Sequence, residues 1–211
     1  MDSEIGRIPK GWKLSFIKEL TTLNKSSWRK NNHPNEVNFL NLGNIKQNNI
    51  LGTDLYQWKD APSSARRILS INDTIVGTVR PGNKSFGYIQ REYLTGSTGF
   101  AVLTPKQEIY AIFVYLCVCS DTNIDRLSRL ADGTAYPKVD NQSILNTRCI
   151  LPPDDLFQIF HILLKPLFER IEISHRESSA LVKLRNTLLP KLISGELRIP
   201  DAETLLEEAG I

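Results

Sequence analysis

Residues 154–193 read DDLFQIFHILLKPLFERIEISHRESSALVKLRNTLLPKLI and decide the fold of the C-terminal part of the chain. The stretch lacks glycine, and its apolar residues recur every three or four positions, which predicts a single amphipathic helix. Asp154 and Asp155 stand where an N-cap and an acidic first turn belong, and Gly195 stands where the helix should end. At about 1.5 Å per residue the helix would be a rod about 60 Å long. Pro166 is expected to kink or divide it.

The apolar stripe of this rod is too long to be buried against the rest of the chain, and no second long helix is predicted. Its middle, Ser174–Ser179, is polar, and an apolar block flanks it on each side. An antiparallel pair would bring one block against the other, and a parallel pair would match like with like, so the pattern permits an antiparallel dimer without requiring it. The residues expected at this dimer or partner interface are Phe160, Leu164, Leu167, Ile171, Leu181, Leu184, Leu188 and Leu192.

The first 150 residues contain short elements separated by many turn signals. Asp73–Val79 alternates polar and apolar residues, which is typical of a strand, whereas Gln107–Ser120 is too long for most strands and predicts a buried helix. Short helices are also expected over Ser15–Leu23 and Ser63–Ile68. The predicted fold class is α+β: a globular domain with helices and a curled, mainly antiparallel sheet, followed by a long C-terminal helix in an antiparallel coiled coil. The expected divisions are residues 1–152 for the globular domain, 153–197 for the long helix and 198–211 for a C-terminal tail.

The charge is unevenly distributed along the 211 residues, whose formal net charge is +3. Residues 1–150 carry 19 Lys and Arg against 13 Asp and Glu, a balance of +6, and residues 151–211 carry 7 against 10, a balance of −3. A basic front joined to a mildly acidic rear is typical of a nucleic-acid-binding domain with a segment that does other work. A balance of +6 is also common in soluble domains, so charge alone does not decide between these interpretations.

The sequence favours a soluble protein of a reducing compartment. The longest apolar run, Tyr110–Cys119, is about half of the roughly 20 residues that a membrane span needs. The acidic start, Met1–Glu4, does not resemble a secretory leader. Three cysteines cannot all pair with one another. We therefore expect a cytoplasmic location and no membrane contact.

No catalytic motif stands out. Gly96–Gly99 lacks the spacing of a dinucleotide or methyl-donor fingerprint, and Leu151–Asp154 lacks both ends of the tetrad that an amino-methyltransferase needs. Cys-x-Cys within an apolar helix points two thiols in different directions, so Cys117 and Cys119 are predicted to be structural rather than metal ligands. His33 is expected to be solvated. No catalytic residue, cofactor or metal is predicted.

Several loops combine cations with hydroxyl, amide or aromatic groups suited to DNA. Lys25–Lys30 offers phosphate partners and an indole, Arg80–Lys84 offers an arginine and an asparagine that can read base edges, and Gly133–Lys138 is a third loop of this kind. Each loop alone could also be ordinary protein surface. The residues expected to contact DNA are Lys25, Ser27, Trp28, Arg29, Lys30, Lys46, Arg80, Asn83, Lys84, Tyr136 and Lys138.

Five stretches, in this order, give the chain a resemblance to a known family. They are IPKGW (8–12), NDTIV (72–76), GFAVL (99–103), ADGTAYP (131–137) and LRNTLLPKLISGEL (184–197), with Pro152-Pro153 and Gln158 opening the helix. Together they resemble the specificity (S) subunit of type I restriction-modification systems, with one target-recognition domain followed by one spacer helix. The last stretch is the most specific, and the first is weak alone.

The resemblance implies a DNA-recognition subunit that does no chemistry itself. Such a subunit reads a bipartite site in double-stranded DNA and carries methyltransferase (modification) subunits, and the complex cleaves DNA when restriction subunits join it. The family normally has two recognition domains and two spacer helices paired antiparallel, whereas this chain has one of each. The resemblance therefore implies a half-subunit that forms a homodimer, a rearranged gene product or a shortened piece.

Two other classes of function remain open from the residues alone. The chain could be a coiled-coil interaction or scaffold protein whose basic face is incidental. It could also be an enzyme in its own right, a nuclease or a methyltransferase, without a recognisable motif. Gel-shift measurements on mixed duplexes separate the first class from a DNA-recognition subunit, and cleavage or methyl transfer by the isolated chain identifies the second.

Overall fold

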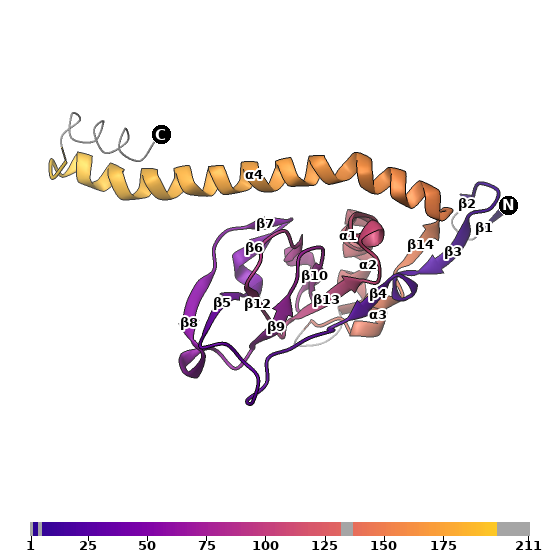
Figure 1. Cartoon of the computed structure of the whole chain (residues 1–211), viewed down its shortest axis with the longest axis horizontal. Coiled ribbons are helices and arrows are strands. Elements are labelled where there is room, and N and C mark those ends of the chain that lie inside the picture. The colour runs from indigo at the N-terminus through magenta and orange to yellow at the C-terminus, as the bar shows by residue number, and fades with distance from the viewer. Residues whose placement is uncertain (1, 4–5, 132–136, 198–211) are drawn as a thin grey trace. The chain divides into compact units, whose positions relative to one another are not determined.

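The computed structural model of the protein describes residues 2–3, 6–131 and 137–197 (Figure 1). The chain divides into two compact units, Met1–Glu169 and Arg170–Ile211. The boundary between them falls inside the last helix, α4 (Asp154–Ile193), so the first four turns of this helix belong to the globular unit.

The globular unit is built from short strands and three short helices. The strands are β1 (Asp2–Ser3), β2 (Gly6–Arg7), β3 (Lys13–Phe16), β4 (Thr21–Leu23), β5 (Glu36–Leu40), β6 (Ile45–Lys46), β7 (Asn49–Ile50), β8 (Asp54–Gln57), β9 (Ala65–Leu69), β10 (Thr74–Gly77), β11 (Phe86–Tyr88), β12 (Leu94–Ser97), β13 (Phe100–Pro105) and β14 (Arg148–Leu151). The short helices are α1 (Ala111–Val118), α2 (Asp121–Ala131) and α3 (Asn141–Leu145).

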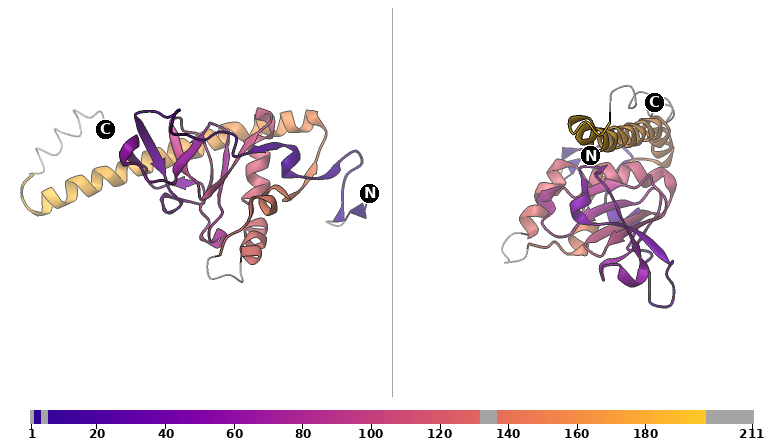
Figure 2. Two further views of the ribbon diagram at one scale, coloured as in Figure 1. Left: turned by 90° about the horizontal axis from the view of Figure 1, so that it is seen from below. Right: turned by 90° about the vertical axis from the view of Figure 1, so that its left-hand side faces the viewer.

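Two four-stranded sheets, in the orders β11-β10-β13-β4 and β8-β5-β12-β9, pack face to face. Successive side chains of a strand point to opposite faces, and the central sheet uses both. Ile75, Phe100 and Val102 pack against the second sheet. Their neighbours Val76, Ala101 and Leu103 pack against α1, α2 and α3. Both views of Figure 2 show α1 and α2 on one side of the strands. The unit is therefore layered as sheet, sheet and helices.

The predicted α+β class is confirmed, and so is the extent of the long helix. The paired strands are antiparallel, as predicted, apart from β5 and β12, which run parallel. The single curled sheet that we expected is instead divided into two sheets and shorter ribbons. Helix α4 continues through Pro166 without being divided there, because it runs unbroken from Asp154 to Ile193.

Two predicted helices are wrong. Ser15–Leu23 forms the end of β3, a single 3-10 turn and β4, and Ser63–Ile68 leads into strand β9. Both segments hold their extended form through partners distant in sequence. β3 pairs with β14, and β9 pairs with β12. Tertiary pairing overrides the local capping signals in both places.

Aromatic side chains join the start of α4 to the rest of the globular unit. The ring of Phe157, 2% exposed, meets the rings of Tyr110 and Phe113 edge to face at centroid distances of 4.9 and 5.0 Å. Three turns later, Phe168 meets Tyr88 and Tyr115 at 5.4 and 5.5 Å. Edge-to-face contacts of this kind add to the stabilisation from burial. The first four turns of α4 are therefore part of the core.

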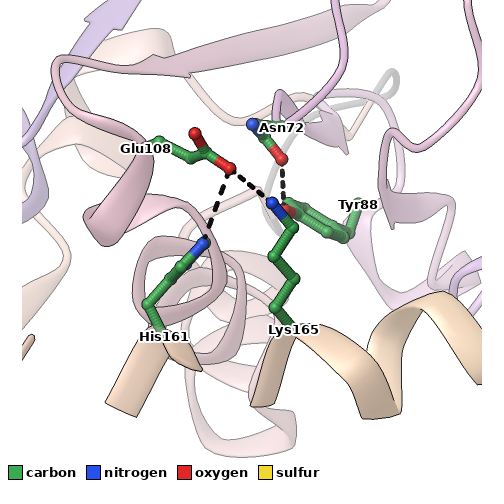
Figure 3. Close-up of polar contacts among 5 residues, drawn as sticks. All are labelled: Asn72, Tyr88, Glu108, His161 and Lys165. Carbon is green, nitrogen blue, oxygen red and sulfur yellow. Dashed lines mark hydrogen bonds and ion pairs between the residues drawn. The ribbon is translucent and has the colours of Figure 1, made fainter. Parts of the chain in front are cut away.

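A polar cluster reinforces this junction (Figure 3). The Lys165 ammonium donates to Glu108 Oε1 at 2.9 Å, and His161 Nε2 lies 3.6 Å from the same oxygen. Close by, the Tyr88 hydroxyl donates to Asn72 Oδ1 at 2.5 Å. The hydrogen bond and the charge of Lys165 lower the pKa of Glu108, and the same contact raises the pKa of Lys165.

The Glu108–Lys165 pair should contribute to stability only at intermediate pH. The Glu108 contribution is lost as pH falls through its lowered pKa, and the Lys165 contribution is lost as pH rises through its raised pKa. Both side chains are about half exposed, so solvent limits the contribution to about 0.5 kcal/mol. Urea unfolding of Lys165→Met should therefore show a small loss of stability at pH 7 that disappears in acid, once the pH has fallen through the lowered pKa of Glu108. An equal loss at both pH values would show that the lysine acts through packing alone.

Candidate nucleic-acid interface

The turn after β10 presents the most distinctive backbone among the predicted DNA contacts. Arg80 and Lys84 both adopt the left-handed conformation, with φ of 46° and 57°, and they flank a 3-10 turn over Pro81–Asn83. A left-handed conformation costs a non-glycine residue about 1–2 kcal/mol. Two hydrogen bonds, from Asn83 N to Arg80 O and from Lys84 N to Pro81 O, both 2.9 Å, hold it. Strain maintained by local bonding is typical of functional turns.

The β6–β7 turn adjoins this loop on one side. Gln47 N donates to Lys84 O at 2.9 Å. The two turns together line an open groove of about 930 Å³. Its polar lining comes from Lys46, Gln47, Arg80, Asn83, Lys84 and Ser85. Lys46 therefore shares one groove with Arg80, Asn83 and Lys84, which follow it by more than thirty positions in the sequence, and all four are predicted DNA contacts.

The segment from Pro137 adjoins the loop on its other side. Arg80 N donates to Pro137 O at 2.9 Å, and Val79 and Lys138 form an antiparallel bridge. A second cavity, of about 460 Å³, lies beside Lys138 and is also lined by Arg67, Thr78 and Thr98. Tyr136, which was predicted with Lys138, lies outside the described residues.

The predicted loop at Lys25–Lys30 reaches the same region through β9. Ser27 bridges to Arg67, whose guanidinium donates to Ser27 Oγ at 3.2 Å. Arg29 and Asn32 exchange two backbone hydrogen bonds of 3.1 Å, which makes a two-residue hairpin with Lys30 at its tip. The Trp28 indole donates to Thr95 Oγ1 at 3.0 Å. The hairpin is thus positioned by contacts within the unit, and Arg29 and Lys30 are exposed.

One of the predicted lysines already has an acidic partner within the chain. Lys84 Nζ lies 2.7 Å from Asp121 Oδ1, and this contact raises the pKa of Lys84. Arg29, Lys30, Arg80 and Lys138 are exposed. They are the stronger candidates for phosphate contacts.

Sequence reasoning missed Arg67 and a neighbouring aromatic stack. The Trp58 ring stacks on His33 with centroids 4.4 Å apart, and the Arg66 guanidinium lies over the same ring at 4.4 Å. His33 is exposed, as predicted, but its ring is also held by this contact. The tandem Arg66-Arg67 was a signal for a basic surface. It was overlooked because the segment was interpreted as a helix rather than as strand β9.

The three cysteines are free thiols packed in the core of the globular unit. Burial raises the pKa of Cys117 to about 12 and that of Cys149 to about 11. Over the described residues, no group of three or more His, Cys, Asp or Glu side chains is arranged to hold a metal ion. In the same part of the chain, no helix is long and apolar enough to cross a membrane.

Comparison with known proteins agrees with the fold. Residues 9–183 match the family described as the type I restriction modification DNA specificity domain. A crystal structure of the HsdS subunit from Thermoanaerobacter tengcongensis is similar, with a TM-score of 0.63 and 22% identity over 89% of this chain and 50% of that one.

Two curated specificity subunits match parts of the sequence. The type I restriction enzyme HindI specificity subunit of Haemophilus influenzae is 24% identical over 75% of this chain and 35% of its own length. The MjaIX specificity subunit of Methanocaldococcus jannaschii is 42% identical over 69 residues, which are 33% of this chain and 16% of that subunit. The chain thus spans half or less of the length of these relatives.

The family match covers most of the sequence and extends from the globular unit into α4. The chain belongs to the type I restriction-modification DNA specificity domain family. The two curated relatives named above are specificity subunits of type I restriction enzymes. The resemblance found in the sequence is confirmed.

Proposed function

We propose that the chain is the DNA-recognition component of a type I restriction-modification complex and reads one half of a bipartite site in double-stranded DNA. The observation that carries this proposal is the linked basic surface. The loop Lys25–Lys30 contacts Arg67, the loop Arg80–Lys84 adjoins the segment of Lys138, and the turn of Lys46 and Gln47 contacts Lys84. Cations position the phosphates, and Asn83 and Gln47 are suited to base edges.

The proposed partners are a second copy of this chain, methyltransferase subunits and, in the complex that cleaves DNA, restriction subunits. The charges of α4 support an antiparallel homodimer. Residues 154–173 carry four acidic and two basic side chains, a balance of −2, and residues 174–193 carry four basic and one acidic, a balance of +3. An antiparallel pair joins the unlike halves and opposes the helix dipoles, whereas a parallel pair joins like halves.

Such a dimer would carry one recognition domain at each end and should prefer a two-fold symmetric site, with the paired helices setting the gap between half-sites. The list of residues predicted at the dimer interface changes at the start of α4. Phe160 and Leu164 pack largely against their own globular unit. Leu156, Ile159 and Leu163 are exposed on the first turns of α4 and offer more to a partner. A scaffold protein with an incidental basic face remains the alternative.

Reversing the charge of Arg80 should weaken duplex binding and flatten its dependence on salt. Arg80→Glu and Lys30→Glu each remove a cation that can displace counterions from DNA, and each should lower the slope of log affinity against log salt by about one or more. Mobility shift and fluorescence anisotropy at several salt concentrations measure both quantities.

Lys18→Glu is the matched control, because Lys18 is an exposed cation on the turn before β4 and belongs to none of the predicted DNA-binding loops. Its effect on DNA binding should be small. Retention of wild-type affinity by both Arg80→Glu and Lys30→Glu would count against the loops as the DNA-binding surface.

A further inference from the structure

An apolar groove of about 780 Å³ lies in the globular unit, outside the proposed DNA surface. It is bordered by α1, by β14 and by the first turns of α4. Several lining side chains are open to solvent: Leu116 is 41% exposed, Ile159 52% and Leu163 66%. Arg148 is the only charged residue among those that line it. An exposed apolar surface of this kind usually marks an interaction site.

The groove continues into the apolar stripe of α4. Leu163 and Leu181 are 18 residues apart, and Leu156 and Leu192 are 36 apart, which correspond to about five and ten turns of a helix with 3.6 residues per turn. The leucines that line the groove and the leucines of the distal half therefore occupy the same face of the helix. A partner that covers this face must also pass over the groove.

One antiparallel register that matches leucines and isoleucines of the stripe brings a defined segment to the groove. Placing Leu163 opposite Leu192 of a second copy also places Leu167 opposite Leu188, and Ile171 opposite Leu184. The two-fold axis then falls at Glu177 and Ser178, inside the polar middle of the stripe. The helix end of the second copy, with Leu192 and Ile193, lies against the groove in this register.

The helix end has the chemistry that such a groove requires. Ile193 is 78% exposed, the most exposed of the large apolar side chains on α4. Gly195, with φ of 73°, ends the helix, and Leu197 N donates back to Lys191 O at 3.0 Å, which closes a Schellman-type turn. This turn brings Leu197 back toward the last helical turn. The exposed Ile193 and the returning Leu197 therefore give the helix end a compact apolar surface.

We propose that the groove binds the C-terminal end of α4, Leu192–Leu197, from a second copy of this chain. The inference rests on the antiparallel homodimer proposed above and adds to it a contact between the recognition domain of one copy and the helix end of the other. Each domain would then be held by both helices of the pair. The groove would fix the orientation of the domain as well as its distance from the symmetry axis.

Cysteine cross-linking tests the dimer and the groove separately. The variant Glu177→Cys places a thiol beside the two-fold axis, so a short bismaleimide should yield a covalent dimer on a denaturing gel. The double variant Leu116→Cys/Ile193→Cys should also yield a covalent dimer, because each groove meets the helix end of the other copy. The native thiols react slowly, since burial raises the pKa of Cys117 and Cys149.

The cross-linking outcomes are distinct. Cross-linked Glu177→Cys without cross-linked Leu116→Cys/Ile193→Cys would overturn the groove contact and leave the antiparallel dimer standing. No covalent dimer from Glu177→Cys would overturn the dimer itself. Covalent dimers from Ile193→Cys alone would indicate parallel helices, because only that arrangement brings the two copies of residue 193 together.

A charge in the groove provides a second readout. Leu116→Asp should raise the dimer dissociation constant at least about tenfold, because docking the helix end would bury an unpaired carboxylate. Leu130→Asp is the matched control, because Leu130 is 55% exposed on α2 and does not line the groove. Circular dichroism establishes that both variants are folded. Equal dissociation constants for the two variants would overturn the proposal.

Discussion

Aspartate at both Leu181 and Leu188 is expected to convert the proposed homodimer into monomers. These two side chains lie on the same face of α4, two turns apart. The Leu181 side chain is 58% exposed in the single chain. In a symmetric pair the double variant would bury four unpaired carboxylates, and each unpaired buried charge costs several kcal/mol. Sedimentation equilibrium over a range of concentrations measures the change, which should exceed a thousandfold in the dimer dissociation constant.

The control variant also adds two aspartates to each chain, but on the opposite face of α4. Ser179 and Asn186 lie two turns apart on the face away from the leucines, so Ser179→Asp/Asn186→Asp should leave the dimer largely intact. The monomeric leucine variant should also lose preference for symmetric duplexes while each domain keeps its basic surface. If dimers persist in the leucine variant, the helix is not the interface.

Phe157→Ala is expected to have the largest effect on the stability of the globular unit. The side chain is 2% exposed and fills the space between Tyr110 and Phe113. Removing a buried phenylalanine ring costs about 3–5 kcal/mol, against a total stability of about 5–15 kcal/mol for a typical domain. Urea unfolding followed by tryptophan fluorescence should show an earlier midpoint, and the start of α4 should lose protection from hydrogen exchange.

Ile162→Ala is the comparison for this prediction. Ile162 lies in the same part of α4 but is 69% exposed, so its loss should cost less than about 1 kcal/mol. Similar losses for the two variants would show that the first turns of α4 are not integrated into the core as the aromatic contacts indicate.

The long helix was predictable because its signals are local. Helical spacing of leucines, acidic residues at the start and Gly195 at the end specify α4 without reference to the rest of the chain. Strand β10 was predictable for a related reason, since the alternation of polar and apolar residues over Asp73–Val79 is also a local pattern.

The failures occurred where the fold depends on distant partners. Ala65–Leu69 carries Arg66 and Arg67 between two buried residues, and only its pairing with β12 makes it a strand. The same error hid Arg67 from the list of candidate DNA contacts. The packing of Phe160 and Leu164 was also beyond sequence reasoning, because a helical stripe does not reveal which of its residues face the parent domain.

Helix α4 begins within the hydrophobic core, with Phe157 and Phe168 fixed by four aromatic rings. These contacts fix the rotation of the first turns of α4 about the helix axis. Each residue inserted into α4 after Glu169 would move the rest of the helix by about 1.5 Å along its axis and rotate it by about 100°. In the proposed dimer, a longer gap between half-sites would therefore require insertions near whole helical turns, because only these preserve the rotational orientation of the recognition domain about the DNA.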